Sequence, residues 1–579
     1  MYNHLSIFCP CEITMQIDLN TVPFSRYGSY LAFSMLPETE TRPAGLYLRS
    51  LHGEAQVREV ARLEVTKDGA SLPFQTQASA SVLRLEAEGG RVEICFAGDR
   101  CIHLRGRGIG LRLTFAPGAF DCAFPAHGRD WQVITFASAV NLHLSAQASE
   151  WRVDAPFHGV RAERLQADLQ PDWLSQTCEG WISEFTSSYQ PPEKTNPFEY
   201  DAAQLELEFK TWLERTPSLP RKYEAARELA AYINWASVVA PSGILMRPSM
   251  FMSKNWMTNV WSWDHCFNAM ALAYHQPDLA WDQFMTLFDQ QDEFGALPDS
   301  VNDLRRVWSF CKPPIHGWTL LHLMQQPELA AHERLEEVYG PLSCWTEWWF
   351  RHRDYDNDGI PQYHHGNDSG WDNCTAFEGS LPLEAPDLSA FLVIQMDALS
   401  QVAAKLGRKA EASNWQRRSQ SLLEHMLSHF WRVNRFMVVQ SGTHQESWSE
   451  TLFNFLPLLL GRRLPLQVQQ ALVQALTMPG FLLTEYGLAT ESPRSKLYEP
   501  DGYWRGPIWA PPTLMMVEGL AAVGKDKLAK DLARQFCDMA AQNGMAENFD
   551  ALTGAGLRDH AYTWTSSVFL ILGHEYLKD

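Results

Sequence analysis

The spacing of apolar residues changes near residue 200, and this change constrains the fold more than any other feature of the chain. Before it, short segments such as 81–86 and 131–136 alternate apolar and polar residues, which is typical of strands with one buried face. After it, apolar residues recur at helical spacing in longer segments, for example 265–287, 389–406 and 525–543. At 579 residues, the chain is also too long for one ordinary domain.

We therefore predict three parts. Residues 1–186 are expected to form an N-terminal β-sandwich, because many short strands are separated by turn signals. Residues 187–201, which contain two adjacent prolines, are predicted to be a linker. Residues 202–579 are predicted to be mainly α, with on the order of a dozen helices. Since no repeat of fixed period is present, an (α/α)6 barrel with a mouth made of loops is favoured over a solenoid.

Composition limits the partners of this chain. A net charge of -20 argues against nucleic acid and against an anionic membrane surface. The 22 tryptophans suit carbohydrate binding, although most of them can equally fill a core. Eleven cysteines without a framework spacing indicate a reducing compartment, and we find neither a leader pattern nor an apolar run long enough to span a membrane. We expect a cytoplasmic protein whose partner is a small carbohydrate, with no required cofactor.

Residues 367–373, with the sequence Asn-Asp-Ser-Gly-Trp-Asp-Asn, form the segment with the clearest chemical content. Glycine and alternating Asp and Asn indicate a loop, and loops between helices commonly carry chemistry. We interpret Asp372 as the catalytic acid of a glycosidase, with a pKa raised by burial against Trp371. A surface turn around a half-buried tryptophan would have the same pattern.

Hydrolysis of a glycosidic bond requires a second carboxylate, because one group protonates the leaving oxygen while another acts on the opposite face. Glu547 stands in an aromatic and amide-rich setting and is one candidate. From residue type alone, other acids in the helical part are equally eligible: Asp264, Asp368, Glu378 and Asp550.

Five motifs occur in one order along the helical part: Trp261-Ser262-Trp263-Asp264-His265, Lys312-Pro313-Pro314, Ser369-Gly370-Trp371-Asp372-Asn373, Tyr503-Trp504-Arg505-Gly506-Pro507-Ile508-Trp509, and Glu547-Asn548-Phe549-Asp550 followed by Thr553-Gly554. Together they resemble glycoside hydrolase family 63 over residues 250–570. The Gly-Trp-Asp piece is also similar to trehalases of the same clan.

This resemblance implies an (α/α)6 barrel and an inverting, exo-acting α-glycosidase, with an α-glucosidase favoured. It implies Asp372 as general acid and Glu547 as general base. The positions implied to line the sugar subsite are Trp261, Trp263, Asp264, Trp371, Arg505 and Trp509. One departure concerns residues 510–513, Ala-Pro-Pro-Thr, where the family usually has an Asn; this bears on the leaving group more than on the reaction.

Residues 354–359 place Asp at the first, third and fifth positions and Gly at the sixth, which resembles the start of a calcium loop. His365 stands where a bidentate Glu would be needed. The alternatives are a structural Ca²⁺ at Asp354–Asp358 and a solvated acidic turn, and neither involves a metal in the chemistry.

Three other functions remain open at this point. A disaccharide phosphorylase on a similar toroid would use phosphate in place of the activated water and would need no base carboxylate. A non-catalytic carbohydrate-binding protein would not need both acids. An epimerase would need paired histidines, whereas His316 and His560 are isolated in the sequence.

Overall fold

The computed structural model describes residues 15–190, 195–379 and 381–578. Contacts between Cα atoms divide the chain into two compact units, with the division between Thr211 and Trp212. Part of the predicted linker, 191–194, lies outside the described residues, as do residues 1–14 of the predicted sandwich. Helix α1 (Phe198–Glu214) begins inside the predicted linker rather than at residue 202. Its first turn carries Glu199 and Asp201, which favour a helix N-terminus.

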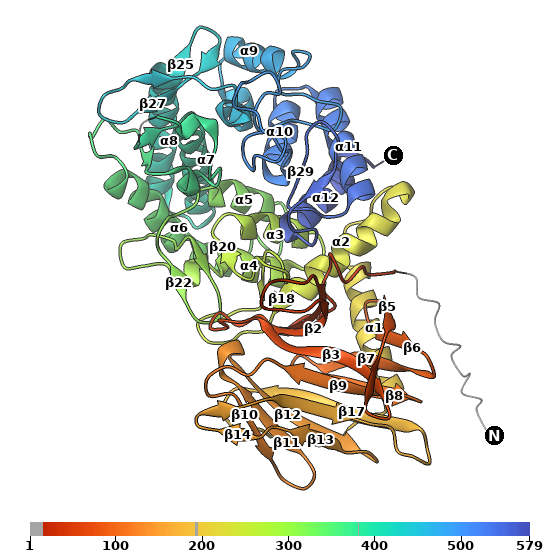
Figure 1. Cartoon of the computed structure of the whole chain (residues 1–579). Coiled ribbons are helices and arrows are strands. Elements are labelled where there is room, and N and C mark those ends of the chain that lie inside the picture. Colours follow the sequence, from red (N-terminus) through yellow and green to blue (C-terminus); the bar gives the residue numbers. More distant parts are fainter. Residues whose placement is uncertain (1–14, 191–194, 380, 579) are drawn as a thin grey trace, which may run out of the picture. The chain divides into compact units, whose positions relative to one another are not determined.

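The first unit contains two large antiparallel sheets (Figure 1). One has the order β1-β2-β3-β9-β16-β13, with β4 paired to β3, and the other has the order β10-β11-β12-β17-β8-β7-β6-β5. Residues alternate between buried and partly exposed, as in β6, where Leu83 and Leu85 are buried while Arg84 and Glu86 are not. The strands of the first sheet are β1 (Leu31–Leu36), β2 (Gly45–Ser50), β3 (Glu59–Lys67), β4 (Ala70–Leu72), β9 (Gly110–Phe115), β13 (Trp151–Asp154) and β16 (Leu165–Leu169). Those of the second are β5 (Phe74–Ala78), β6 (Leu83–Ala87), β7 (Gly90–Gly98), β8 (Cys101–Arg107), β10 (Cys122–Pro125), β11 (Trp131–Thr135), β12 (Val140–Gln147) and β17 (Thr177–Phe185).

The second unit is built from helices joined by long loops. Most helices follow the predicted segments, but the predicted helix over 265–287 is wrong. Pro277 cannot continue a helix that precedes it, and the segment divides into α3 and α4. The helices are α2 (Glu224–Ser237), α3 (Asp264–Leu272), α4 (Pro277–Met285), α5 (His316–Leu323), α6 (His332–His352), α7 (Pro386–Lys405), α8 (Lys409–Phe430), α9 (Leu466–Leu476), α10 (Ala510–Ala522), α11 (Asp526–Asn543) and α12 (Thr563–Tyr576), together with the 3-10 segment η6 (Leu452–Arg463).

Six of these elements contact one another in a circuit. Helix α3 contacts α5, α5 contacts α7, and α7 contacts η6. The circuit continues from η6 to α10 and from α10 to α12, which returns to α3. In Figure 1, α3, α5, α7, α10 and α12 lie toward the middle of the helical unit, with α6, α8, α9 and α11 farther out.

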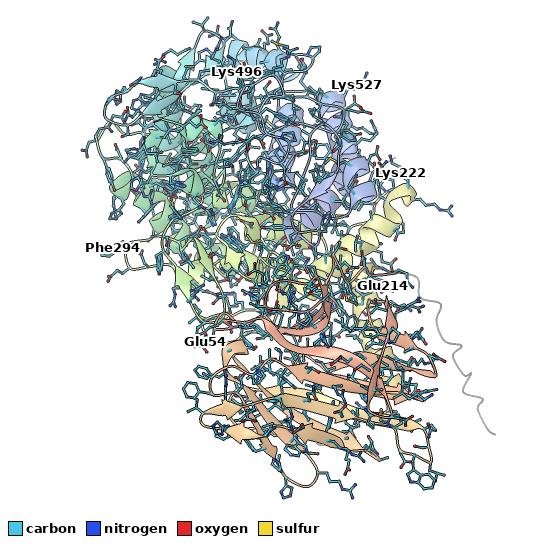
Figure 2. All side chains as sticks on the ribbon, in the orientation of Figure 1. Glu54, Glu214, Lys222, Phe294, Lys496 and Lys527 are labelled. Carbon is cyan, nitrogen blue, oxygen red and sulfur yellow. The ribbon has the colours of Figure 1, made fainter. Side chains whose placement is uncertain are left out.

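The sequences of the two groups of helices explain this arrangement. Helices α3 and α12 bury nearly every residue, their Thr, Ser, Asn and Asp side chains included, as expected of helices surrounded by other elements. Helix α11 buries only one stripe and exposes charged residues on the other side. Figure 2 shows side chains such as Lys222 and Lys527 extending from the surface of this unit. None of the described helices is both long and apolar enough to cross a membrane.

Candidate active site

The candidate residues lie in the segments that lead into the N-terminal ends of the central helices. Asp264 is the first residue of α3, and Lys312 precedes α5. Asp372 precedes α7, Arg505 precedes α10, and Glu547 precedes α12. Helix N-termini carry partial positive charge and favour anions. The fold therefore places acids from distant segments of the chain near the N-terminal ends of the central helices.

Lys312 is the buried cation of this region. Its Nζ atom lies 3.7 Å from Oδ1 of Asp372 and 3.2 Å from Oδ1 of Asp299. It also donates to the backbone and side-chain oxygens of Asn367, at 2.7 and 2.6 Å. Lys312 is only 4% exposed, so its positive charge acts on these carboxylates with little screening by water.

Burial raises the pKa of Asp372, and repulsion from Asp299 adds to that effect, while Lys312 and His365 oppose it. Burial also raises the pKa of Asp264 well above its ordinary value, with Lys312 opposing and Asp299 and Asp372 adding. Both groups are thus held closer to the protonated form than exposed aspartates would be. A carboxyl group that keeps its proton near neutral pH can act as a general acid.

Glu547 is 6% exposed, and burial raises its pKa to about 7. Repulsion from Asp559 adds to the rise, whereas Arg558 and a hydrogen bond from Tyr503 oppose it. Asp559 is itself buried: its Oδ1 accepts from Asn255 Nδ2 at 3.0 Å, and its Oδ2 has no partner among the described residues. Glu547 therefore changes its charge in the range where a general base is useful.

Tyr503 connects the two candidate catalytic acids. Burial raises its pKa, and the negative charges of Asp372, Glu547 and Asp264 act on it in addition. Its φ of 63° is rare for an aromatic residue and costs on the order of 1–3 kcal/mol. Arg558, at the same φ, lies over its ring with the guanidinium carbon 4.9 Å from the ring centroid. Backbone strain of this kind is concentrated at functional sites.

Asn373, next to Asp372, joins the segment of the acid to the segment of Arg505. Its Nδ2 donates to the carbonyl of Gly502 at 3.0 Å, and its Oδ1 accepts from the backbone N–H of Trp504 at 2.9 Å. Arg505 Nε donates to the carbonyl of Asn373 at 2.9 Å, and Arg505 also forms an ion pair with Glu378 at 2.7 Å. Asp372 is thereby fixed relative to a loop that lies more than 100 residues away in sequence.

The tryptophans of the motifs pack on one another. The rings of Trp504 and Trp509 stack with centroids 3.9 Å apart, and Trp371 lies 4.7 Å from Trp504. These rings and that of Trp263 are 0–2% exposed. Gly370, with a φ of 76°, lets Trp263 approach, because a Cβ atom there would lie 2.5 Å from the ring. These tryptophans form a rigid wall behind the acids, and their predicted contact with sugar stays a prediction, as does that of half-buried Trp261.

The four other acids that residue type alone could not separate from Glu547 as catalytic candidates have different environments. Asp368 is 1% exposed and accepts from Arg353 Nη1 and from two backbone N–H groups, which gives it a lowered pKa and a role in holding the loop. Asp550 accepts from the N–H groups of residues 552 and 553 and forms a turn. Glu378 pairs with Arg505. Only Asp264 shares the charge environment of Asp372 among these four.

Sequence reasoning missed Asp299, Asp559 and the central position of Lys312. Lys312 belongs to one of the five motifs, and a lysine in a motif set that also contains tryptophans and acids was the available signal. Asp299 and Asp559 lie outside all five motifs, so only the folded structure reveals them.

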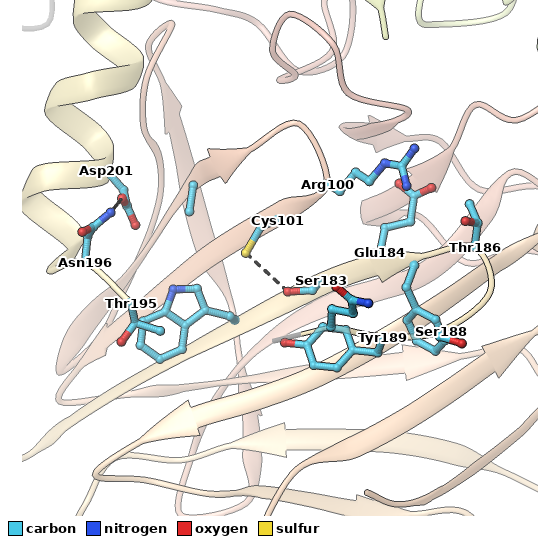
Figure 3. Close-up of a pocket in the computed structure, with 14 residues that line it drawn as sticks. Arg100, Cys101, Ser183, Glu184, Thr186, Ser188, Tyr189, Thr195, Asn196 and Asp201 are labelled. Atoms are coloured by element: carbon cyan, nitrogen blue, oxygen red, sulfur yellow. Dashed lines mark hydrogen bonds between the residues drawn. The ribbon is translucent and has the colours of Figure 1, made fainter. Parts of the chain in front are cut away.

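The first unit contains a pocket of about 400 Å³, shown in Figure 3. Arg100, Cys101, Glu184 and Asp201 line it. Glu184 forms an ion pair with His52, and Asp201 with His103, each within 2.8 Å. Burial raises the pKa of the Cys101 thiol to about 11. Each of these acids thus has a histidine partner, although the buried Oε2 of Glu184 has none among the described residues, and the thiol is not activated.

The model of the mannosylglycerate hydrolase MGH1-like glycoside hydrolase domain matches residues 257–565, more than half of the chain. The chain belongs to this family. The matched range contains every predicted site residue from Trp261 to Glu547. The predicted membership of glycoside hydrolase family 63 is confirmed, and the protein is a glycoside hydrolase.

Two curated relatives of this family member show how far the likeness extends. Mannosylglycerate hydrolase MGH1 of Selaginella moellendorffii is 22% identical over 391 residues, which cover 54% of this chain and 79% of that protein. Glucosylglycerate hydrolase of Mycolicibacterium hassiacum is 23% identical over 410 residues, which cover 54% of this chain and 91% of that protein.

Solved structures show the same fold. The GH63 mannosylglycerate hydrolase from Thermus thermophilus, in complex with glucose, has a TM-score of 0.52 at 20% identity and covers 60% of this chain and 99% of its own. A bacterial glucoamylase complexed with acarbose has a TM-score of 0.62 at 13% identity and covers 100% of this chain and 97% of its own. The order of a β unit followed by a helical unit is therefore shared with a glucoamylase over the full length.

Proposed function

We propose that this protein is an inverting, exo-acting α-glycosidase with Asp372 as general acid and Glu547 as general base. The observation that carries the proposal is the convergence of Asp372, Asp264 and Glu547 on Tyr503, from segments up to 283 residues apart in the family domain. A phosphorylase or a binding protein would not need two such acids.

In this mechanism, the carboxyl group of Asp372 protonates the glycosidic oxygen as the bond between that oxygen and the anomeric carbon breaks. Ionised Glu547 removes a proton from the water that attacks the opposite face of the anomeric carbon. Lys312 holds the buried acids in place by neutralising part of their charge. Tyr503 donates to Glu547 and stabilises its ionised form.

We propose the (α/α)6 barrel of residues 202–579 as the scaffold of this site. The closed circuit would supply the six inner elements of this barrel, namely α3, α5, α7, η6, α10 and α12. The six outer elements would be the amphipathic helices α2, α4, α6, α8, α9 and α11. The two sheets of the first unit, each with one buried face, support the proposed β-sandwich of residues 1–186.

The proposed substrate is a small α-glucoside, either a disaccharide or glucosylglycerate. A relative named glucosylglycerate hydrolase and a family 63 structure in complex with glucose support glucose as the non-reducing sugar. Mannosylglycerate is the second candidate, because several relatives are named mannosylglycerate hydrolases. Small substrates fit a site whose wall is rigid and whose acids are largely buried.

The test is a hydrolysis screen over α-1,2, α-1,3, α-1,4 and α-1,6 glucobioses together with glucosylglycerate and mannosylglycerate. Proton NMR follows the released sugar. We expect the β-anomer first, and an α-anomer as first product refutes inversion. Release of a sugar 1-phosphate that depends on added phosphate would instead establish a phosphorylase.

Two variants and a matched control test the assigned roles. Asp372→Asn is expected to lose about 10²–10⁴-fold in kcat/KM on the natural glycoside. A glycosyl fluoride needs no protonated leaving group, so it restores turnover in Asp372→Asn but not in Glu547→Gln. Asp550→Asn keeps the Oδ1 acceptor of its turn and is expected to retain activity. Loss of activity in Asp550→Asn, or rescue of Glu547→Gln by the fluoride, contradicts the assignment.

A further inference from the structure

The acidic loop 354–359 is closed by a hydrogen bond from the N–H of Gly359 to Oδ2 of Asp354 at 3.1 Å, and two of its carboxylates face a histidine from a distant turn. Asp356 Oδ2 lies 3.1 Å from Nε2 of His444, and Asp358 Oδ2 lies 3.6 Å from the same nitrogen. His444 belongs to the turn between β27 (Val438–Gln440) and β28 (Glu446–Ser447). Strand β27 pairs with β24 (Leu383–Glu384), which supplies a third carboxylate, that of Glu384.

Asp356, Asp358, Glu384 and His444 form what we call the imidazole–carboxylate cluster. Each offers one ligand atom, and these four atoms lie within 4.8 Å of one another. Glu384 is 0% exposed, yet its Oε1 has no hydrogen-bond partner among the described residues, and neither has the buried Oδ1 of Asp356. Buried carboxylate oxygens without partners are costly, and a bound cation would satisfy them.

Two further features suit a ligand set. His429 Nε2 lies 2.7 Å from Glu384 Oε2, and its Nδ1 lies 3.9 Å from Asp358 Oδ2, so this ring orients two carboxylates of the cluster, as outer groups commonly do around metal ligands. His444 has a φ of 52°, a strained conformation for a histidine, while its ring is directed at the two aspartates. His444 is exposed and Asp356 is partly exposed, so an ion can enter from solvent.

We propose that the imidazole–carboxylate cluster binds one divalent transition-metal ion of the zinc class. Three carboxylates and one imidazole complete a four-coordinate set for Zn²⁺, whereas Ca²⁺ prefers six to eight oxygens and takes no imidazole. The ion ties loop 354–359 to β24 and to the β27–β28 turn. Asp372 lies in the segment between β23 (Gln362–Tyr363) and β24. The ion therefore anchors one end of the loop that carries the proposed general acid.

The experiment measures metal binding and stability, not activity, and is therefore independent of the proposed hydrolysis. The full chain is stripped with a chelator, dialysed, and loaded with Zn²⁺, Co²⁺ or Ca²⁺. Elemental analysis is expected to give one Zn²⁺ per chain, and Co²⁺ is expected to give visible d–d bands of a four-coordinate site. At a hundredfold excess over Kd, Zn²⁺ is expected to raise Tm by about 3 °C.

Matched variants locate the site. His444→Asn removes the imidazole but keeps a residue that tolerates positive φ, and it is expected to weaken Zn²⁺ binding at least tenfold. Asp358→Asn keeps the Oδ1 acceptor for the N–H of Ile360 and is expected to abolish binding. His332→Asn, at an exposed histidine of α6, is the control and is expected to bind as the parent does. Unchanged Zn²⁺ binding in Asp358→Asn overturns the proposal, as do tighter binding of Ca²⁺ than of Zn²⁺ and failure of the parent to bind Zn²⁺.

Discussion

Glu547→Gln is expected to stabilise the protein at alkaline pH while it abolishes hydrolysis. The pKa of Glu547 in the folded chain is about 7, against an ordinary value of 4.5. A raised pKa means that the folded state holds the proton more strongly than the unfolded state does. The stability from this group is therefore complete below pH 4.5 and is lost as pH rises through 7. At about 1.4 kcal/mol for each pH unit between the two pKa values, the loss approaches about 3 kcal/mol.

The assay is thermal unfolding of parent and variant between pH 5 and pH 8. Between pH 5 and pH 8 about 2.5 kcal/mol of this stability is lost, which for a helical unit of this size corresponds to about 3 °C in Tm. The Tm of Glu547→Gln minus that of the parent is expected to increase by this amount across the pH range. Burial also raises the pKa of Asp387 to about 7, but this group is present in both proteins and cancels in the difference.

Glu485→Gln, at an exposed glutamate, is the control and is expected to show no such trend. A Tm difference for Glu547→Gln that stays constant from pH 5 to pH 8 would refute the buried, proton-holding state of Glu547. It would do so whether or not the variant is active, because the measurement involves no substrate.

Further predictions concern the neighbours of the two acids. Tyr503→Phe removes a hydrogen bond that favours ionised Glu547, so the acid limb of kcat/KM, expected near pH 7, should move to higher pH. Asp559→Asn removes a repelling charge and should move the same limb to lower pH; a shift in the opposite direction in either variant contradicts the assignment of Glu547 as base. Asn373→Ala should lower kcat/KM at least about tenfold, because the segments of Asp372 and Arg505 lose two hydrogen bonds between them, and unchanged kinetics would show that this link is dispensable. Gly370→Ala should cost about 1–3 kcal/mol in denaturant unfolding, since its Cβ would meet Trp263, and an unchanged midpoint would contradict the close packing.

The helices could be predicted because their apolar spacing is local information. The helix predicted over 525–543 corresponds to α11, Asp526–Asn543. The prediction of a single helix over 265–287 was wrong for an equally local reason. Pro277 interrupts a helix that precedes it, although the apolar spacing continues past it. The motifs pointed to the segments of the candidate site for the same reason, and the roles of their residues stay predictions.

The charge environment of the site could not be predicted, because it depends on groups that are distant in sequence. Asp368 and Asp372 are four residues apart in one loop, yet Arg353 and hydrogen bonds make one a structural acid while burial near Lys312 raises the pKa of the other. The histidines His429 and His444 gave no signal in the sequence. Only the sheet that joins β24 to β27 brings His444 to the acidic loop.

Helix α12 packs against α2 and α3, the first helices of its unit. The circuit is therefore closed by side-chain packing between the helices of the unit that are synthesised first and the helix that is synthesised last. No peptide bond joins the two at this contact. A nascent chain cannot complete the circuit until residues 563–576 have left the ribosome, and the segment that carries Glu547 is among the last to be fixed.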